Sequence, residues 1–552
     1  MARRTGRRAA MSVAAATITA ALAISACGRS ATSNGGSGSI SPTKNLVVST
    51  RAGTKSVSSV TWAVYRDVNS LDPIFAFDYP ENTAISLMCE SLLEQQPDGS
   101  IVPGLATMTD PSPDKLVFTI NPAATFWDGH PVTPADVVYS LDRQMNPSFG
   151  GFYGLVFSRV ASIVATGSDQ VTITLKQPDY WLPGELSSMP GVIIEKAYAQ
   201  KEGKNYGAPA GGIMCTGAYE LKSWTPGVGV TAVANPHYWN TAVKTPLVKQ
   251  IILKGVPEIT TFTSGLETGA IQGAYDMGLS TLPELQADKA AVSVYQGPGE
   301  ATDAFIVSSS KGALGSLKVR EALSLALNRK AVIANVYKGA ALMPRWIANP
   351  GTFGYGKSVF DKAYAASPVL TQNLAQARKL VKEAGATGDT ITIGTSAQLS
   401  NIAAVTGAYQ QAAQAIGLKV KLDSVSAQNY INFFTDPKAR AGVDGFLTLN
   451  YGDYADPAAL LATIVLPGAS QNYDNFDNTK LTALMEQARG TANPDKRAAL
   501  VAQAEEMAAK LLPWIPTVQP TNLLLLGKGL TGATASFSYM FAPWANSLGG
   551  TG

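Results

Sequence analysis

One acidic segment, residues 444–457, combines residue types that suit the binding of a positively charged ligand. Phe446 and Thr448 favour a short strand, and Gly452 lets the backbone leave that strand abruptly. Asp453 then lies at the strand's end, where its carboxylate can meet a positive group while the strand edge pairs with an extended ligand. Acidic turns are common, so a solvated turn is the alternative interpretation of this segment alone.

Motifs for catalysis are weak by comparison. His130 and His237 lie in separate motifs without metal-ligand spacing, and both are interpreted as structural. Residues 308–311 match Ser-x-x-Lys, but the companion Ser-Asp-Asn and Lys-Thr-Gly motifs are missing from the sequence. Residues 474–478 resemble a calcium loop, but Phe476 occupies a ligand position. We therefore expect no catalytic site, no metal site and no cofactor.

The first 26 residues are typical of an export signal. Four arginines precede an uncharged stretch, residues 9–26, whose apolar part is too short for a good membrane span. The stretch ends in Ile-Ser-Ala-Cys27, which resembles the lipobox of bacterial lipoproteins, where the cysteine carries lipid. An ordinary signal peptide with a chance cysteine is the alternative. Residues 27–45, rich in Ser and Gly, predict a flexible tether. We expect a bacterial protein anchored by lipid on the extracytoplasmic face of the cell membrane.

The net charge limits the kinds of partner that the protein can bind, and the chain length indicates how many lobes it has. Removal of the four signal arginines changes the formal net charge from +3 to about −1, so nucleic acid is not expected as a partner. The mature chain exceeds what one core usually supports, which predicts at least two lobes. Beside Cys27, the remaining Cys89 and Cys215 form an even pair that suggests one disulfide outside the cytoplasm. Two buried free thiols are the alternative.

Periodicity places further elements. Strands are predicted at 59–65, 116–120, 390–394, 418–422 and 517–526, and helices at 82–95, 317–327, 372–383, 402–416 and from Pro494 onward. The alternation beyond about residue 306 is a βαβ pattern, which predicts an α/β lobe there.

Residues 124–143 form the most specific motif. Asp128 and Gly129 predict a tight turn, and Thr133, Pro134 and Asp136 predict a capped helix start. The whole stretch resembles the signature of the extracellular solute-binding proteins of family 5, the peptide/nickel class that serves ABC importers. Further segments resemble motifs of that family in the same order: 102–106, 215–219, 235–239 and 318–329.

The resemblance implies an α/β fold of the large, cluster C, type II periplasmic-binding-protein class, with two hinged lobes in a Venus-flytrap arrangement and an extra subdomain in the first lobe. The expected hinge strands contain residues 305–307 and 518–519. The implied division is a signal peptide (1–26), a tether (27–45), the first lobe (46–90, 210–305 and 519–552), its extra subdomain (91–209) and the second lobe (306–518).

The resemblance also implies the ligand-binding residues. Residues 450–457 are similar to a family segment whose first aspartate, here Asp453, pairs with the α-ammonium of a bound peptide. Asn450 replaces the tryptophan usual in that segment, which changes the pocket wall. A loop on the facing lobe matches the family loop that lines the ligand's other edge. The candidate ligand-binding residues are Asn450, Tyr451, Gly452, Asp453, Tyr454, Asp67, Val68 and Asn69.

The predicted function is therefore capture of di- or oligopeptides and their delivery to ABC permease subunits in the membrane, by a monomer. The same fold could instead bind an oligosaccharide or chelated nickel, or could sense peptides without transport. A secreted hydrolase with an unrecognised site is the alternative outside this class.

Overall fold

The computed structural model describes residues 45–397 and 399–552. The predicted signal peptide, Cys27 and almost all of the predicted tether lie outside the described residues. No helix within the described residues has the length and apolar character needed to span a bilayer.

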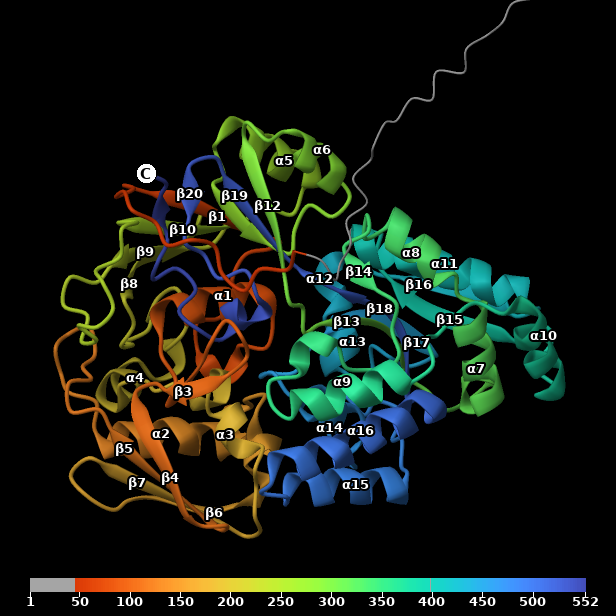
Figure 1. Ribbon diagram of the computed structural model, residues 1–552, viewed down its shortest axis with the longest axis horizontal. Coiled ribbons are helices and arrows are strands. Elements are labelled where there is room, and N and C mark those ends of the chain that lie inside the picture. The colour runs from red at the N-terminus through yellow and green to blue at the C-terminus, as the bar shows by residue number, and fades with distance from the viewer. Residues whose placement is uncertain (1–44, 398) are drawn as a thin grey trace, which may run out of the picture. The chain divides into compact units, whose positions relative to one another are not determined.

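Two large sheets organise the described chain (Figure 1). The first, in spatial order, consists of β12 (Val292–Gly297), β19 (Asn522–Gly527), β11 (Gly273–Tyr275), β1 (Val60–Val64), β10 (Gln250–Gly255), β9 (Gly229–Ala234) and β8 (Tyr219–Thr225). The second consists of β14 (Ala341–Leu342), β18 (Trp514–Pro520), β13 (Thr302–Val307), β17 (Gly445–Asn450), β15 (Thr390–Thr395) and β16 (Lys419–Ser424).

The remaining strands form three smaller sheets. They comprise a four-stranded sheet of β4 (Ala106–Ser112), β5 (Lys115–Ile120), β7 (Gln170–Leu175) and β6 (Val160–Ala165), and the pairs β2 (Leu93–Gln95) with β3 (Ile101–Pro103) and β20 (Leu530–Thr531) with β21 (Gly549–Gly550).

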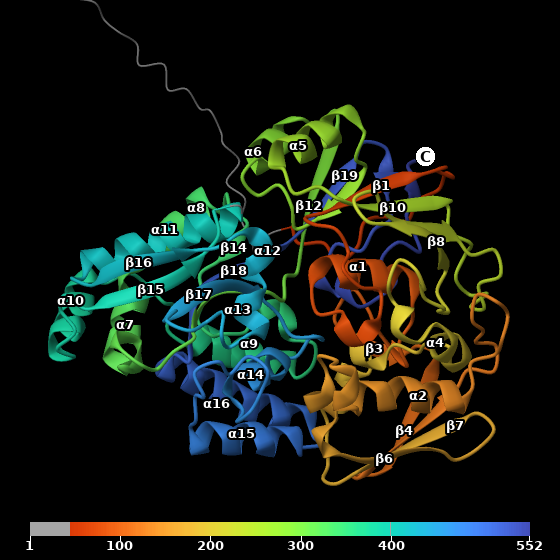
Figure 2. The same cartoon turned by 180° about the vertical axis from the view of Figure 1, so that it is seen from behind.

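Helices pack on these sheets. Their bounds are α1 (Tyr79–Met88), α2 (Pro134–Met145), α3 (Leu182–Glu185), α4 (Lys196–Glu202), α5 (Ile259–Thr268), α6 (Leu282–Ala287), α7 (Leu317–Ala326), α8 (Arg329–Asn335), α9 (Lys357–Ala366), α10 (Leu374–Glu383), α11 (Ser400–Ala415), α12 (Ala427–Tyr430), α13 (Asn432–Thr435), α14 (Pro457–Val465), α15 (Thr479–Arg489) and α16 (Pro494–Leu511). Figure 2 shows α2 lying along the four-stranded sheet, with which it shares a buried apolar cluster.

The chain passes between the two large sheets twice. It leaves the first sheet after Gly297 and enters the second at Thr302, and it returns between Pro520 and Asn522. The blue β19 therefore lies among strands drawn in red and green in Figure 1. The crossing segments are 298–301 and Thr521, whereas the expected hinge residues lie within β13 and β18.

Most elements predicted from periodicity are present. The α2 start carries the predicted capping box, in which Thr133 accepts from the Asp136 amide and the Asp136 carboxylate accepts from the Thr133 amide. The parallel pairing of β15 with β16 around α11 is the predicted βαβ unit.

The helix predicted over residues 82–95 is wrong at both ends. It begins at Tyr79, where the Asp78 side chain caps it, and ends at Met88. Beyond Met88 the backbone pairs with other segments instead: the Leu92 amide donates to the Gly191 carbonyl, and residues 93–95 form β2. Apolar spacing alone does not distinguish a helix's last turn from a buried strand, because both bury successive apolar residues.

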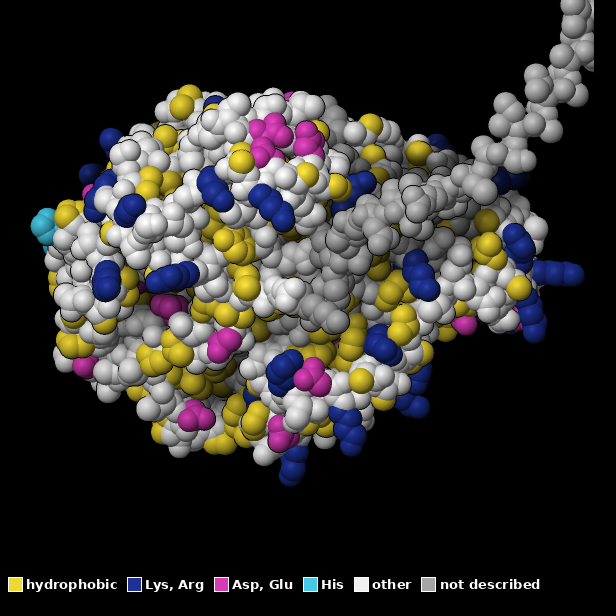
Figure 3. Space-filling view, turned by 45° about the horizontal axis from the view of Figure 1, so that its top comes forward, with side chains coloured by type: hydrophobic (Ala, Val, Ile, Leu, Met, Phe, Trp, Pro, Cys, Tyr) yellow, Lys and Arg dark blue, Asp and Glu magenta, His cyan; other side chains and the backbone are white. Residues whose placement is uncertain are grey.

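The exposed charges are mixed in sign. Figure 3 shows one face of the molecule, on which Lys and Arg side chains lie scattered among acidic and apolar ones. Among the described residues of this face, the basic side chains do not form a continuous patch of the kind that nucleic acid binds.

Candidate functional site

A cavity of about 1190 Å³ lies between elements of the two large sheets. Its wall includes residues of β1 and the loop that follows it, the segment 447–453 after the middle of β17, and α3. Aromatic side chains supply much of the surface, among them Trp62, Tyr79, Phe152, Trp181, Tyr430, Tyr451 and Tyr539. A cavity of this size, mainly apolar with a few polar groups, suits an organic ligand.

Strand β17 brings its end into this cavity. Gly445 is required at its start, since a Cβ there would lie 2.3 Å from the Phe305 ring. The strand pairs with β13 along its whole length but with β15 only at Gly445 and Phe446. Beyond Phe446, the Leu447 amide donates to the Tyr430 hydroxyl at 3.1 Å, and that hydroxyl donates to the Leu447 carbonyl at 2.8 Å.

The edge of β17 facing away from β13 is therefore open after Leu447. Along a strand, the backbone amide and carbonyl of successive residues point to alternate edges. The amide and carbonyl of Leu449 therefore point to the same edge as those of Leu447. Leu449 lines the cavity. The strand is interior to its sheet at its beginning and has a free edge at its end, which is the feature that the sequence analysis expected of it.

Asp453 lies just beyond this free edge. Its backbone carbonyl accepts from Gln95 Nε2 at 2.7 Å, which fixes the loop. Its carboxylate lines the cavity and has no hydrogen-bond or ion-pair partner among the described residues. Burial raises the pKa of Asp453 to about 7. A buried carboxylate without a partner is costly when ionised, and a positively charged ligand would remove that cost.

The three residues before Asp453 also line the cavity. The Asn450 side chain exchanges hydrogen bonds with Gln471. The Tyr451 hydroxyl donates to the Phe77 carbonyl at 3.1 Å. Gly452 packs against α14, where a Cβ would lie 2.6 Å from that of Ala459.

Tyr454 lies outside the cavity wall. Its side chain is buried, and its ring packs against Gly184 of α3 so closely that a Cβ on Gly184 would lie 2.3 Å from Cε2 of the ring. Tyr454 thus supports the loop that carries Asp453 and joins it to α3.

The loop after β1 contributes differently from the prediction. Asn69 lines the cavity, but Asp67 and Val68 do not. Asp67 accepts from the Gly227 amide at 2.8 Å, and Val68 is buried. Arg66, which the sequence analysis did not single out, lines the cavity instead.

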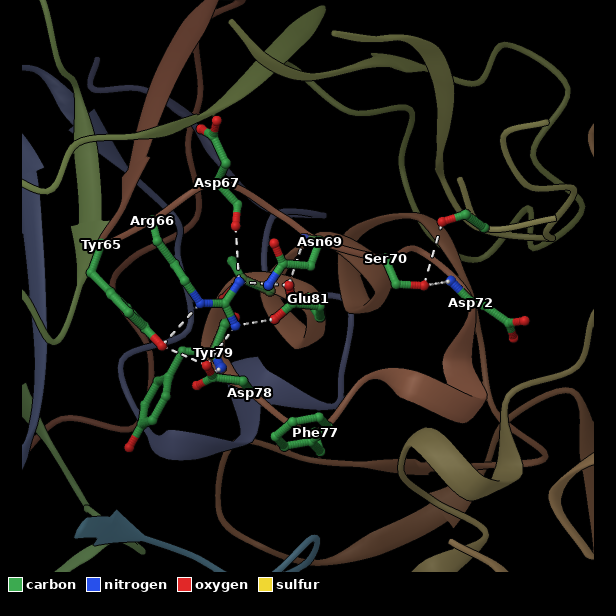
Figure 4. Close-up of polar contacts among 12 residues, drawn as sticks. Tyr65, Arg66, Asp67, Asn69, Ser70, Asp72, Phe77, Asp78, Tyr79 and Glu81 are labelled. Atoms are coloured by element: carbon green, nitrogen blue, oxygen red, sulfur yellow. Dashed lines mark hydrogen bonds and ion pairs between the residues drawn. The ribbon is translucent and has the colours of Figure 1, made fainter. Parts of the chain in front are cut away.

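Arg66 forms ion pairs with Asp78, the N-cap residue of α1, and with Glu81 in the first turn of α1. Figure 4 shows its guanidinium between Asp78 and Glu81, at 2.5 and 2.7 Å, with the Tyr65 hydroxyl beside it. The Asn69 amide donates to Glu81 at 2.7 Å, so the same network fixes the loop. Both acids precede the helix predicted at 82–95, in a segment where the sequence gave no signal for this role.

Glu185, the last residue of α3, is a second residue that the sequence analysis missed. It lines the cavity, its Oε2 is buried, and its carboxylate has no hydrogen-bond partner in the described part of the chain. Burial, and next the negative charge of Asp453, raise the pKa of Glu185 well above its usual value.

The neighbouring Arg489 is already paired. Its Nη2 lies 2.6 Å from Asp179 Oδ2 and donates to the Val156 carbonyl at 3.1 Å. This pair joins α15 to the segment that leads into α3, and the Arg159–Glu486 ion pair joins α15 to the residues directly before β6.

His130 lies away from the cavity, on the surface. Its Nδ1 is 2.9 Å from Asp128 Oδ2 and 3.0 Å from Glu195 Oε1. The hydrogen bond to Glu195, and next the charge of Asp128, raise the pKa of His130. The three side chains can place ligand atoms within 4.8 Å of one another, an arrangement that the sequence spacing did not indicate.

Cys89 and Cys215 form a disulfide in the structure, as predicted. The bond connects the C-cap of α1 to the segment before β8, across a sequence separation of 126 residues. It therefore holds the cavity wall contributed by α1 to the first sheet.

Known proteins resemble this chain along most of its length. The periplasmic murein peptide-binding protein MppA of Escherichia coli K12 is 27% identical over 487 residues, covering 84% of this chain and 88% of that protein. The periplasmic oligopeptide-binding protein OppA of the same organism is 27% identical over 503 residues, covering 85% and 88%. The solved structure of DppA from Helicobacter pylori, an ABC transporter-associated periplasmic binding protein in complex with the peptide STSA, superposes with a TM-score of 0.77 at 20% identity, covering 90% and 99%.

These likenesses confirm the predicted α/β periplasmic-binding-protein fold. A family model described as bacterial extracellular solute-binding proteins, family 5, middle region, matches residues 100–472. Because that match spans more than half of the sequence, the chain belongs to the bacterial extracellular solute-binding proteins of family 5, whose members bind solutes and are not enzymes.

Proposed function

We propose that this protein captures peptides by their amino end and delivers them to the membrane permease of an ABC importer. One observation carries the proposal: the unpaired carboxylate of Asp453 faces the cavity at the point where the free edge of β17 ends. A free strand edge and a carboxylate at its end match the two features that every unmodified peptide shares, an extended backbone and an α-ammonium group.

The backbone of the ligand would pair with β17. The amide and carbonyl of Leu449 are available on the free side, next to the open surface of the cavity. Main-chain hydrogen bonds do not depend on side-chain identity, so this mode of binding tolerates many sequences.

The ammonium group supplies the selectivity for an amino end. Ionised Asp453 lacks a compensating charge from the described residues, whereas a bound ammonium would provide one in surroundings where water is largely excluded. The state with ligand enclosed is thereby favoured over the state without it.

The names of two relatives support a peptide as the solute. They are a murein peptide-binding protein and an oligopeptide-binding protein, each similar over more than four fifths of this chain. At 27% sequence identity, the ligand of this protein has to be inferred from its own cavity residues. Those residues include acidic and aromatic side chains.

Membrane attachment and movement complete the proposal. Lipid on Cys27 would hold a monomer near the permease, with residues 27–45 as the tether. The first lobe is assigned to residues 46–297 with 522–552, including the extra subdomain at 91–209, and the second lobe to residues 302–520, so that the bounds follow the two sheets and not the expected divisions at 305/306 and 518/519. The crossing segments 298–301 and Thr521 are the proposed hinges.

Calorimetric titration with Ala-Ala-Ala tests the proposal. Asp453→Asn removes the charge without changing the shape of the side chain, and we expect it to weaken binding about tenfold or more because a hydrogen bond to a charged group is lost. The melting temperature should stay nearly unchanged.

Asp67→Asn is the matched control, since Asp67 lies outside the cavity wall. It should leave the affinity for Ala-Ala-Ala as it is, and acetylation of the peptide's amino group should reproduce the loss seen with Asp453→Asn. Equal affinities of Asp453→Asn and Asp67→Asn for unacetylated Ala-Ala-Ala contradict the proposal. Tight binding of a neutral oligosaccharide or a nickel chelate instead of the peptide also contradicts it. Loss of peptide uptake on deletion of the gene separates transport from sensing.

A further inference from the structure

The charges of the described cavity wall offer no free partner to a negatively charged group of a ligand. In the described part of the chain, the only basic side chains in its wall are Arg66 and Arg489. Arg66 is held by Asp78 and Glu81, and Arg489 by Asp179. Neither guanidinium is free to receive the carboxylate of a ligand.

Most acidic side chains in the wall have partners. Asp276 accepts from the Leu523 amide at 2.7 Å and from a tyrosine hydroxyl, and Asp303 accepts from the Tyr337 hydroxyl at 2.7 Å. Glu486 is paired with Arg159. Glu258 is exposed to solvent, where a carboxylate is stable without a partner.

Asp453 and Glu185 differ from all of these. Both line the cavity, both carboxylates lack hydrogen bonds within the described residues, and the Oε2 of Glu185 is buried. Their negative charges also act on each other. With both ionised, the nearby Asp179–Arg489 pair adds no net charge, so the two carboxylates together require two positive charges.

The two carboxylates are held in a fixed relation. Tyr454 packs against Gly184, directly before Glu185, and Gln95 holds the Asp453 carbonyl. The nearby Asp456 is excluded as a third ligand contact, since it caps α14 by accepting from the Ala458 amide at 2.8 Å.

We propose that Glu185 is a second ammonium-binding residue, so that this protein selects peptides with two positive charges close to their amino end. The proposal rests on the proposed capture of a peptide's α-ammonium by Asp453. The second charge belongs to the side chain of a lysine-like residue at the first or second position. A peptide with a single positive charge would leave Glu185 buried without a counterion, or would require it to keep a proton, and either condition weakens binding.

Calorimetric titration at about pH 7 tests this directly, where both kinds of ammonium are largely charged. The probes are Lys-Ala-Ala and Ala-Lys-Ala, each compared with the same peptide carrying norleucine in place of lysine, which keeps the apolar stem and removes the charge. The wild-type protein should bind one of the two lysine peptides about tenfold more tightly than its norleucine counterpart, the size expected for one charged hydrogen bond.

Glu185→Gln should abolish most of this preference while keeping the affinity for the norleucine peptide. Glu258→Gln removes the same charge from an exposed part of the wall and should preserve the preference. Asp453→Asn should weaken the binding of all four peptides.

The outcomes separate the two proposals. Equal affinities for lysine and norleucine peptides, both dependent on Asp453, overturn the role of Glu185 and leave peptide capture intact. A lysine preference that survives Glu185→Gln also overturns it. Peptide binding that does not depend on Asp453, or on a free α-amino group, overturns the proposed function itself.

Discussion

Two aspartates of one turn illustrate how burial and hydrogen bonding assign different roles. Asp456 accepts hydrogen bonds from the Ala458 amide and the Tyr355 hydroxyl, so its carboxylate caps the N-terminus of α14. Asp453 has no such donors among the described residues and faces the cavity. Burial raises the pKa of Asp453 to about 7 and that of Asp456 to about 6, with the Ala458 amide opposing the rise at Asp456. Sequence reasoning could name Asp453 through a family motif, but Glu185 belongs to no motif and is brought there only by tertiary contacts.

The raised pKa of Asp453 predicts that peptide affinity depends on pH. Below about pH 7 the carboxyl group of the free protein is increasingly protonated, and an ammonium prefers the ionised form. Affinity should therefore rise from pH 5 to about 7 and fall again above about pH 8, where the peptide's α-amino group loses its proton. Binding at pH 6 should release protons, measurable by calorimetry in buffers of different ionisation enthalpy.

In Asp453→Asn the rise between pH 5 and 7 should become much smaller, while the fall at high pH remains. Glu185 should contribute to the same rise in affinity between pH 5 and 7, since its pKa is also raised, and Arg489, the cation beside it, is paired with Asp179. An affinity that decreases from pH 5 to 7 would contradict this account of Asp453.

Among the elements, β17 was predictable as a strand but not in its place within the sheet. Its apolar residues and Gly452 indicate a strand that ends abruptly. Its pairing with β15 ends at Phe446, and the Tyr430 hydroxyl then forms the hydrogen bonds of the Leu447 backbone. Both features depend on long-range packing. The short helix α3 is still harder to predict, because four residues give no periodic signal.

The contact between α3 and the Asp453 loop predicts a measurable effect of Gly184→Ala. The added Cβ would overlap the buried Tyr454 ring, so the loop must move, and overpacking of this kind costs about 1–3 kcal/mol. We expect a lower melting temperature together with weaker peptide binding.

Gly407→Ala is the matched control for this change. Gly407 lies inside α11, and a Cβ there meets no atom within 4 Å. The substitution should leave peptide affinity unchanged and keep or slightly raise stability, because alanine favours a helix interior over glycine. An unchanged affinity in Gly184→Ala would show that α3 does not support the site.

At the scale of the whole molecule, the sequence predicted the family, the fold and most regular elements. The capping box of α2, the βαβ unit and the disulfide depend on local patterns or on counting, and all three are present. The cavity's charge balance was not predictable, since Arg66, Glu185 and Arg489 gain their meaning from partners distant in sequence. Pairing of Arg489 with Asp179, for example, spans 310 positions along the chain.

A crystal structure of the protein with Ala-Ala-Ala bound tests the central claim most directly. The account predicts the peptide's α-ammonium nitrogen within about 3.2 Å of an Asp453 carboxylate oxygen, with its backbone hydrogen-bonded to Leu449. A peptide bound in the reverse direction, or an ammonium group held elsewhere while Asp453 stays without a partner, would contradict it.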